Sequence, residues 1–304
     1  MPTRRQFLAA GGAALAGAVG TGLYAWQVEP HWVEIVRRPM PLPHLPTTLV
    51  GRTLLQLSDL HVGPRVDSSY LTRTLSRAAE LEPDFVVLTG DFISYRSPAV
   101  YRELRRVLAH LPRGRMSTVA ALGNHDFGPG WRSVSIADQV TKIVIDAGAE
   151  VLRNERRMLS GIQFAGLGDY WSPEFGVARP IRSLLSAPPS APGAPESSRA
   201  AATLASLDAT KPTVVLCHNP DALDEPIWGN LAAWVLAGHT HGGQCKPPFL
   251  PPPILPVRNK RYTAGAFDVG ARRTLYINRG LGHLIQVRFN VRPEITLFTL
   301  QAAA

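Results

Sequence analysis

The sequence predicts an α/β fold in which a mixed double sheet lies between helical layers. Three observations predict it. Short apolar runs of strand length recur along the chain, amphipathic stretches lie between several of them, and polar residues able to bind metal follow five of these runs. The chain has 304 residues, 45% hydrophobic and 18% charged, so it is long enough to bury one large core. One globular domain is therefore expected.

An apolar segment opens the chain. It begins with Thr3-Arg4-Arg5-Gln6-Phe7-Leu8 and stays uncharged to about Trp26. This pattern is typical of an export signal, and the paired arginines indicate the twin-arginine (Tat) route, with the Tat export machinery as a partner. The small residues Ala16-Gly17-Ala18 suit cleavage, yet the run also reaches the roughly 20 residues that span a bilayer. Residues 1–27 are expected to be a twin-arginine export signal or a membrane anchor, which places the protein in the bacterial periplasm or cell envelope.

The rest of the chain contains three Pro-rich segments. Residues 28–50 are expected to form an extended linker, and residues 51–304 the folded domain. The segment 186–198 is expected to be a flexible surface loop, either an inert insertion or part of the active-site rim. A third run, 247–256, follows the last polar block and is placed to shape a substrate-binding mouth.

Helices are expected between strands in the first half of the domain, and strands alone in the last third. The amphipathic stretches that predict helices are Tyr70–Glu80, Ala99–His110 and Val134–Ala147. The strands expected in the last third are Thr274–Asn278, Ile285–Phe289 and Glu294–Leu300. This order of elements predicts a mixed two-sheet sandwich.

Five polar blocks carry the chemistry. In chain order they are Asp59-Leu60-His61, Gly90-Asp91, Gly123-Asn124-His125-Asp126, Cys217-His218-Asn219 and Gly238-His239-Thr240-His241. The apolar runs before them are Leu54–Leu57, Phe85–Leu88, Val119–Leu122, Val214–Leu216 and Trp234–Ala237. Because strand ends in an open α/β sheet line one crevice, these blocks are expected to converge on one site.

The residue types in the blocks indicate a site for two divalent metal ions. Imidazole nitrogens and carboxylate oxygens suit Zn, Fe, Mn and similar ions, whereas a thiolate set would have selected a softer metal or a closed structural zinc. Two ions about 3.5 to 4 Å apart share a ligand, and one carboxylate can face both of them. Asp91 is the expected bridge.

The order of these blocks resembles that of the calcineurin-like metallophosphoesterase superfamily, over about Leu54 to Leu300. Further matches point to the bacterial branch that includes Tat-exported phosphoesterases and UDP-2,3-diacylglucosamine pyrophosphatase-like proteins. They are Leu57-Ser58-Asp59-Leu60-His61, His239-Thr240-His241-Gly242-Gly243-Gln244, Asn278-Arg279-Gly280-Leu281-Gly282 and Arg292-Pro293-Glu294-Ile295. The resemblance implies a four-layer α/β/β/α metallophosphoesterase sandwich.

The resemblance also implies a role for each residue. Asp59, His61 and His241 would bind the first metal, Asn124, His218 and His239 the second, and Asp91 both. His125 would not bind metal; it would protonate the leaving group or stabilise its charge. Asp126 would orient His125. No position of the set is substituted, so an active enzyme is expected.

The net charge of +9 and pI near 10.1 mostly reflect arginine. They are consistent with scattered surface charge or with attraction to phosphate esters and anionic headgroups. Arg279 and Arg65 are candidate phosphate contacts. No motif indicates nucleic-acid binding.

Residues outside the blocks are given structural roles. Cys217 and Cys245 are expected to be structural, with Cys217 buried in the sheet. The other histidines are expected at the surface or in loops: His31, His44, His110 and His283.

The sequence therefore predicts a dinuclear phosphoester hydrolase with a water nucleophile, acting on a phosphodiester or pyrophosphate bond at or outside the cytoplasmic membrane. A lipid-linked phosphoester is among the expected substrates. The alternative is a UDP-2,3-diacylglucosamine pyrophosphatase of lipid A biosynthesis, although that precursor is handled on the cytoplasmic face. A non-catalytic scaffold of the same fold is a further alternative, but a scaffold has no need of a leaving-group acid such as His125.

Overall fold

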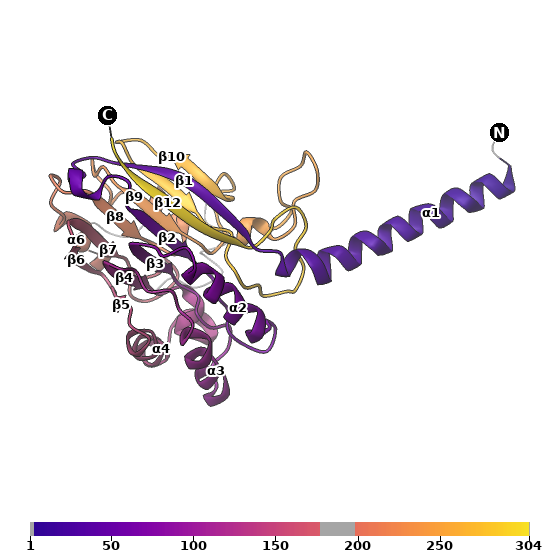
Figure 1. The fold of residues 1–304 in the computed structure, drawn as a ribbon, viewed down its shortest axis with the longest axis horizontal. Coiled ribbons are helices and arrows are strands. Elements are labelled where there is room, and N and C mark those ends of the chain that lie inside the picture. The colour runs from indigo at the N-terminus through magenta and orange to yellow at the C-terminus, as the bar shows by residue number, and fades with distance from the viewer. Residues whose placement is uncertain (1–2, 177–197, 304) are drawn as a thin grey trace.

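Two six-stranded mixed sheets form the centre of the molecule in the computed structural model, which describes residues 3–176 and 198–303 (Figure 1). The first sheet has the order β1 (Glu34–Leu42), β12 (Glu294–Ala302), β2 (Thr53–Leu57), β3 (Phe85–Thr89), β4 (Ser117–Ala121) and β5 (Glu150–Val151). The second has the order β10 (Gly265–Asp268), β11 (Thr274–Ile277), β9 (Trp234–Ala237), β8 (Thr213–Leu216), β7 (Ile162–Gly166) and β6 (Glu155–Leu159).

Most neighbouring strands are parallel, and three pairs are antiparallel: β12 with β2, β6 with β7, and β10 with β11. The predicted mixed double sheet is confirmed. The five strands that precede the polar blocks are β2, β3 and β4 in the first sheet and β8 and β9 in the second. These five strands are parallel to their neighbours in this group, so their carboxyl ends point the same way within each sheet.

Three helices cover the outer face of the first sheet: α2 (Ser68–Ala79), α3 (Pro98–Leu108) and α4 (Val134–Asp146). They agree with the three predicted helices to within a few residues. Asp67 caps α2 by accepting hydrogen bonds from the backbone amides of Ser69 and Tyr70, and Ser97 caps α3 in the same way at Val100. Leucine, valine and isoleucine side chains on the inward faces pack on the sheet.

Successive side chains of a strand point to opposite faces of the first sheet, so each face packs into a hydrophobic core of its own. On β2, Leu55 and Leu57 face the helices, whereas Leu54 faces the second sheet. Between the sheets, the Phe85 ring of β3 lies 5.9 Å from the Phe164 ring of β7, and both are fully buried. The sheets are therefore joined by a dry aromatic and aliphatic layer.

The outer face of the second sheet has a thinner cover. In the described ranges, α6 (Arg199–Ala205) packs there with aromatic side chains from loops, including Tyr170, Trp228 and Tyr262. This layer completes the α/β/β/α sandwich. The loop expected at 186–198 lies outside the described residues, apart from Ser198.

The structure of two segments differs from the sequence expectations. Residues 28–50 are not simply a linker, because β1 pairs along its whole length with β12 at the sheet edge. Its alternating burial, with Met40 and Leu42 inside, explains the pairing despite Pro39 and Pro41. Residues 285–289 form a loop in place of the expected strand.

His283 lies in a loop, as expected. It is fully buried, and its ring nitrogen bonds to the carbonyl of Arg65. Burial lowers its pKa to about 4, so the ring stays neutral. His44 and His110 are exposed, as expected.

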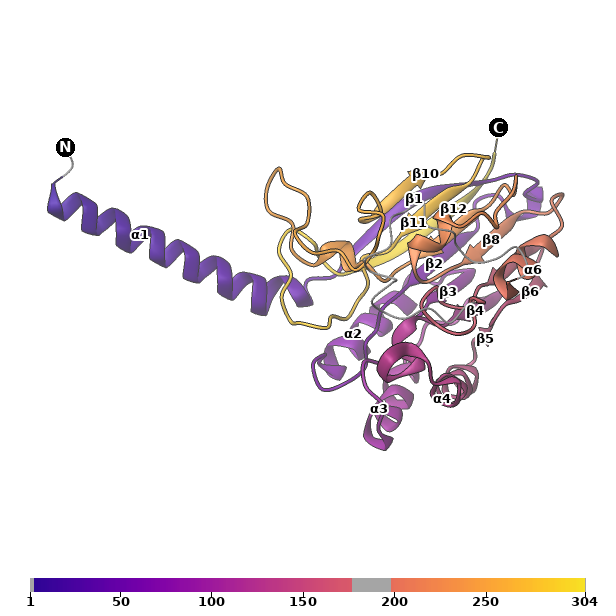
Figure 2. The same cartoon turned by 180° about the vertical axis from the view of Figure 1, so that it is seen from behind.

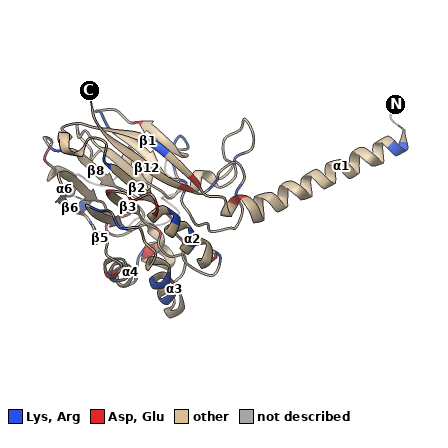
Figure 3. Ribbon diagram, viewed as in Figure 1, with Lys and Arg blue, Asp and Glu red and all other residues tan. Residues whose placement is uncertain are grey.

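One helix stands apart from the sandwich. The helix α1 (Arg4–Leu23) projects away from the domain and buries none of its residues (Figures 1 and 2). Its charge is confined to the first turn, at Arg4 and Arg5 (Figure 3). Together with the turns that follow, to His31, it is long and apolar enough to cross a membrane.

The layer between the sheets is expected to dominate the stability of the domain. Phe85→Ala should lower the free energy of unfolding by about 3–5 kcal/mol, because it removes a fully buried ring and leaves a cavity. Urea titration followed by circular dichroism measures the loss. Ile145→Ala on α4, where the side chain is 52% exposed, is the control and should stay within about 0.5 kcal/mol of wild type. Equal effects would contradict this view of the core.

Candidate metal centre

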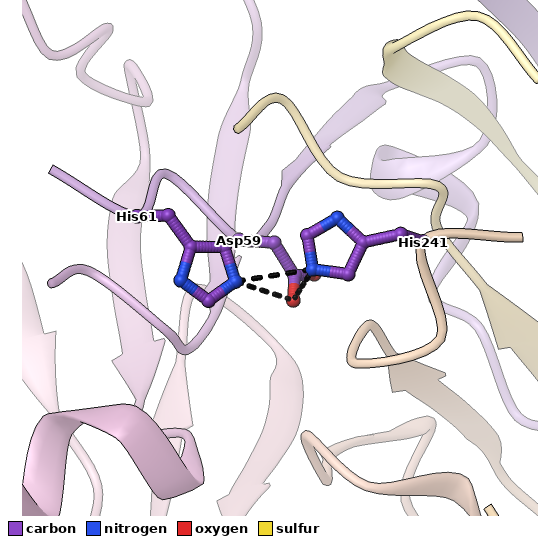
Figure 4. Close-up of side chains that lie close together, drawn as sticks. All are labelled: Asp59, His61 and His241. Atoms are coloured by element: carbon purple, nitrogen blue, oxygen red, sulfur yellow. Dashed lines mark hydrogen bonds and ion pairs between the residues drawn. The ribbon is translucent and has the colours of Figure 1, made fainter. Parts of the chain in front are cut away.

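The first ligand cluster joins the two sheets. Asp59 and His61 follow β2, and His241 follows β9. The Oδ1 atom of Asp59 lies 3.2 Å from Nε2 of His241 and 3.8 Å from Nε2 of His61, and the two imidazole nitrogens are 3.0 Å apart (Figure 4). All three side chains are buried. Three potential ligand atoms so close together could hold a metal ion.

The second cluster contains Asp91, which lies beside His61 of the first cluster. The Oδ2 atom of Asp91 lies 3.1 Å from Nε2 of His218 and 3.5 Å from Nε2 of His61. His239 completes this cluster, with its Nδ1 atom 3.3 Å from Nε2 of His218. One carboxylate oxygen therefore faces histidines of both clusters.

Asn124 is a further candidate metal ligand, because of its burial and its chemistry. Its side chain is fully buried, and neither amide atom has a hydrogen-bond partner in the described ranges. A buried amide with no partner costs about 1–3 kcal/mol. A divalent ion bound by the amide oxygen would remove that cost, so this residue fits a metal site better than a metal-free core.

Hydrogen bonds at the outer nitrogens of the histidines point the other nitrogens inward. The Nδ1 atom of His218 lies 2.6 Å from the carbonyl of Thr89, and Nε2 of His239 lies 2.8 Å from the carbonyl of Pro256. Each ring must donate there, so in the neutral form of each ring Nε2 of His218 and Nδ1 of His239 are the nitrogens with a lone pair for metal. The rings are thus oriented for metal before any metal binds.

The electrostatics of the metal-free chain are dominated by burial and by Asp91. Burial opposes ionisation of Asp91, but nearby imidazoles, above all His218, hold its pKa well below the usual range. Burial also acts against charge on His218, yet Asp91 raises its pKa well above the usual value. For His239, burial and the charge of His218 lower the pKa to about 3. A proton on His218 therefore occupies a place that metal would take.

The backbone is strained at the ligands. Five of the candidate metal residues have positive φ, between 49° and 70°: Asp59, His61, Asp91, His239 and His241. The left-handed region costs a residue with a Cβ atom roughly 1–2 kcal/mol. Such strain concentrates at functional sites, where the fold holds side chains in positions that local preferences oppose.

His125 and Asp126 take different places. His125 lines the cavity above the clusters, half-buried, with its ring centre 5.0 Å from that of His61. Asp126 was expected to orient His125, but this is not what the described residues show. Its carboxylate accepts hydrogen bonds from four backbone amides, those of Asp91, Phe92, Ile93 and Gly123. Through these hydrogen bonds, Asp126 holds together the two loops that carry Asp91 and Asn124.

The two candidate phosphate contacts differ. Arg279 is held by ion pairs with Glu34 of β1 and Glu294 of β12, and it does not line the cavity in the described ranges. Its expected contact with phosphate is not supported, since two carboxylates already neutralise its charge. Arg65 is exposed, lies over the Tyr95 ring, and donates to the carbonyl of Leu284 at the cavity wall. It stays a prediction.

Several residues at the site were missed by the sequence analysis. Asp169 is fully buried, and its Oδ2 atom has no partner in the described part of the chain; burial raises its pKa to about 7. It follows β7 in a Gly-Asp pair, the same signal as Gly90-Asp91, so the pattern was visible. Arg288 is also fully buried, donating to the carbonyls of Arg279, Gly280 and Gly282 in the loop beside His241. Nothing in the local sequence distinguishes this arginine from a surface one.

Apolar walls surround the metal-binding residues. The cavity above the clusters has a volume of about 400 Å³. Trp131 and Trp171 stack at one side with ring centres 4.6 Å apart, and Trp171 meets the edge of the His239 ring. Proline and aliphatic side chains form the opposite side: Pro253, Ile254, Pro256, Leu284, Ile285 and Val287. A polar floor under apolar walls suits a phosphoester with an apolar portion.

A mixed double-sheet sandwich that gathers carboxylates and imidazoles at its strand ends defines a metal-dependent phosphoesterase. The calcineurin-like phosphoesterase family model matches residues 52–243. The chain belongs to the calcineurin-like phosphoesterase family, and it is a hydrolase. The family is metal-dependent, and the carboxylate and imidazole clusters provide ligands for metal.

Bacterial relatives match along almost the whole chain. It is 32% identical to "Phosphodiesterase YaeI" of Escherichia coli over 99% of this chain and 100% of that protein. It is 32% identical to "Uncharacterized metallophosphoesterase YkuE" of Bacillus subtilis over 99% of this chain and 98% of that protein. "UDP-2,3-diacylglucosamine pyrophosphatase LpxG" of Chlamydia muridarum is 26% identical over 94% of both chains.

The position of Asp91 between the clusters leads to a test of metal content. Asp91→Asn should lose bound metal as well as activity, because a neutral amide cannot hold two cations together as a carboxylate does. Metal per chain is measured by mass spectrometry after dialysis. Asp146→Asn on α4, an exposed carboxylate, is the control and should keep wild-type metal. Full metal content and full activity in Asp91→Asn would remove Asp91 from the centre.

Proposed function

We propose that the protein is a dinuclear metal-dependent hydrolase of phosphodiester or pyrophosphate bonds that acts at or outside the cytoplasmic membrane. The observation that carries the proposal is the Oδ2 atom of Asp91, within 3.5 Å of histidine nitrogens of both clusters. Asp59, His61 and His241 would hold one ion, and Asn124, His218 and His239 the other. Mn, Zn, Fe or a similar divalent ion suits this oxygen and nitrogen set.

The division of labour in the site follows from its donors. The chemistry that two divalent ions supply is activation of a water for attack on phosphorus and compensation of charge on the phosphoryl oxygens. The chain itself must provide a proton, or positive charge, for the leaving oxygen. His125 faces the cavity, is half-buried, and is held at its backbone amide by Oδ1 of Asp91, at 2.9 Å. It is the proposed proton donor.

Location is proposed from α1. The helix has two arginines in its first turn, no other charge, and no buried residue. A twin-arginine leader, or an anchor with Arg4 and Arg5 on the cytoplasmic side, would place the catalytic domain on the outer face. The Tat machinery is then a partner.

A second candidate substrate is a UDP-2,3-diacylglucosamine-type pyrophosphate, as in the LpxG relatives. The apolar cavity walls favour it, because acyl chains would lie against them. The location proposed from α1 argues for a different phosphoester on the outer face. Assaying both a nucleotide-sugar diphosphate and a simple phosphodiester with added Mn separates the two.

The role of His125 is tested by comparing leaving groups. His125→Ala should keep its metal but slow hydrolysis by about a hundredfold or more for an alkyl leaving group, since a basic alkoxide needs a proton. The loss should be smaller with p-nitrophenolate. The kcat values of wild type and variant for both substrates make the comparison, with His110→Ala, an exposed histidine, as control.

Two results would contradict the role of His125. Equal losses on both substrates would make it a positioning residue. Loss of metal would make it a ligand, a role that its distance to His61 and Asp91 also permits.

The leader is tested by conservative replacement. Changing Arg4 and Arg5 together to Lys should block export while the domain stays folded and active, because the pair is read by a receptor and touches no part of the sandwich. Protease accessibility in whole cells measures the location. The pair Arg105→Lys and Arg106→Lys on α3 is the control. Unchanged export of the first variant would show an ordinary signal or anchor.

A further inference from the structure

Large apolar side chains are exposed around the mouth of the cavity. Ile254 and Leu250 are 75% and 59% exposed, Ile285 is 66% exposed, and Phe249 is fully exposed. They come from two loops, residues 247–256 and 283–287. Soluble surfaces rarely gather such residues without a partner.

The second of these loops contacts the segment that follows α1. The backbone amide of Arg288 donates to the carbonyl of Ala25 at 2.9 Å, and the side-chain amide of Gln286 donates to the carbonyl of Trp26 at 3.2 Å. Trp26 is itself 50% exposed. In both views the loops lie beside the root of α1, at the same end of the molecule (Figures 1 and 2). A bilayer crossed by α1 would therefore meet these loops.

Charge on the loops has one sign. From Gln244 to Phe267 the sequence contains no aspartate or glutamate, and the same holds for residues 279–293. Lys246, Lys260 and Arg261 are exposed in the first segment. Apolar side chains with neighbouring cations and without acids are the pattern of a surface that binds an anionic bilayer.

The exposed residues and the cavity form a continuous apolar path. Ile254 and Ile285 belong both to the exposed group and to the cavity wall, whose floor is formed by His61, Asp91 and His239. A molecule with its tail in a bilayer could thus keep the tail against apolar side chains while its phosphoryl group reaches the ligand clusters. A soluble phosphoester would have no use for this path.

We propose that Trp26, Phe249, Leu250, Ile254 and Ile285, here called the mouth surface, dock on a lipid bilayer and take the substrate from it. The substrate class is an amphipathic phosphoester with an acyl or alkyl tail. This inference rests on the proposed function and specifies its substrate. The mouth surface then serves as a second attachment to the membrane besides α1. Its docking turns the opening of the cavity towards the lipid.

The test uses two substrates with the same leaving group. Full-length protein with Mn is placed in vesicles of phosphatidylethanolamine and phosphatidylglycerol. Dodecyl p-nitrophenyl phosphate is added to the vesicles, and methyl p-nitrophenyl phosphate to the solution. The variant is Phe249→Ser with Leu250→Ser, two residues outside the cavity wall. Its kcat/KM should fall about tenfold or more on the dodecyl substrate and stay within about twofold on the methyl substrate, since only docking is lost.

A matched control carries Ile145→Ser and Met158→Ser. These side chains are 52% and 46% exposed, on α4 and β6, far from α1 in both views (Figures 1 and 2). The control should behave as wild type on both substrates. The inference is overturned if the mouth variant matches wild type on the dodecyl substrate, if it loses equally on both substrates, or if the control loses as much.

Insertion of the mouth surface is measured directly and without catalysis. The tryptophan fluorescence that Phe249→Trp adds to that of wild type should be quenched by vesicles of brominated lipid. The fluorescence that Ile145→Trp adds should not be quenched. Equal quenching, or none at position 249, overturns docking. If wild type hydrolyses neither phosphodiester, the proposed function fails, and the quenching result still decides the docking surface.

Discussion

The closeness of the two sheets at their carboxyl ends is the constraint on which the site depends. Asp59, His61 and Asp91 come from one sheet, and His218, His239 and His241 from the other, so neither sheet can form the centre alone. Gln56 bridges the gap by donating to the carbonyl of Ala237 at 2.9 Å, and both carboxylate oxygens of Asp59 accept from the backbone amide of His239 at 3.1 Å. Gly238 permits this approach, because a Cβ atom there would lie 2.0 Å from Oγ of Ser58. The aromatic layer between the sheets therefore supports the chemistry as well as the stability.

Much of this arrangement could be predicted from the sequence. Strand-length apolar runs followed by Asp, Asn and His predict the five strands and the gathering of these polar residues, because parallel strand ends share one edge. Contacts between segments that lie far apart in the sequence could not be predicted from it. The pairing of β1 with β12 joins residues about 260 apart in sequence, and no local pattern encodes it. The ion pairs of Arg279 and the backbone contacts of Asp126 likewise follow from where neighbouring loops lie, which motif order does not describe.

Protons and metal compete for the same atoms in this centre. Asp91 raises the pKa of His218 and so favours a proton there, whereas burial, and next the charge of His218, lower the pKa of His239 and keep it neutral. Metal must displace the proton from His218, so its binding should weaken as pH falls. The neutral His239 and the partnerless amide of Asn124 carry no such cost. His218 is thus the residue of the second cluster at which metal binding is most sensitive to acid.

The left-handed backbone at the ligands limits how this enzyme can be engineered. At Asp59, His61, Asp91, His239 and His241, glycine would relieve the backbone strain but would remove the ligand, so thermostabilising design has to leave all five unchanged. Ala271 and Arg272 have similar φ values, 53° and 55°, in an exposed turn remote from the chemistry. Glycine at those two positions would relax the same kind of strain with no ligand at stake. Substitutions that change stability can therefore be made at positions that carry no candidate ligand.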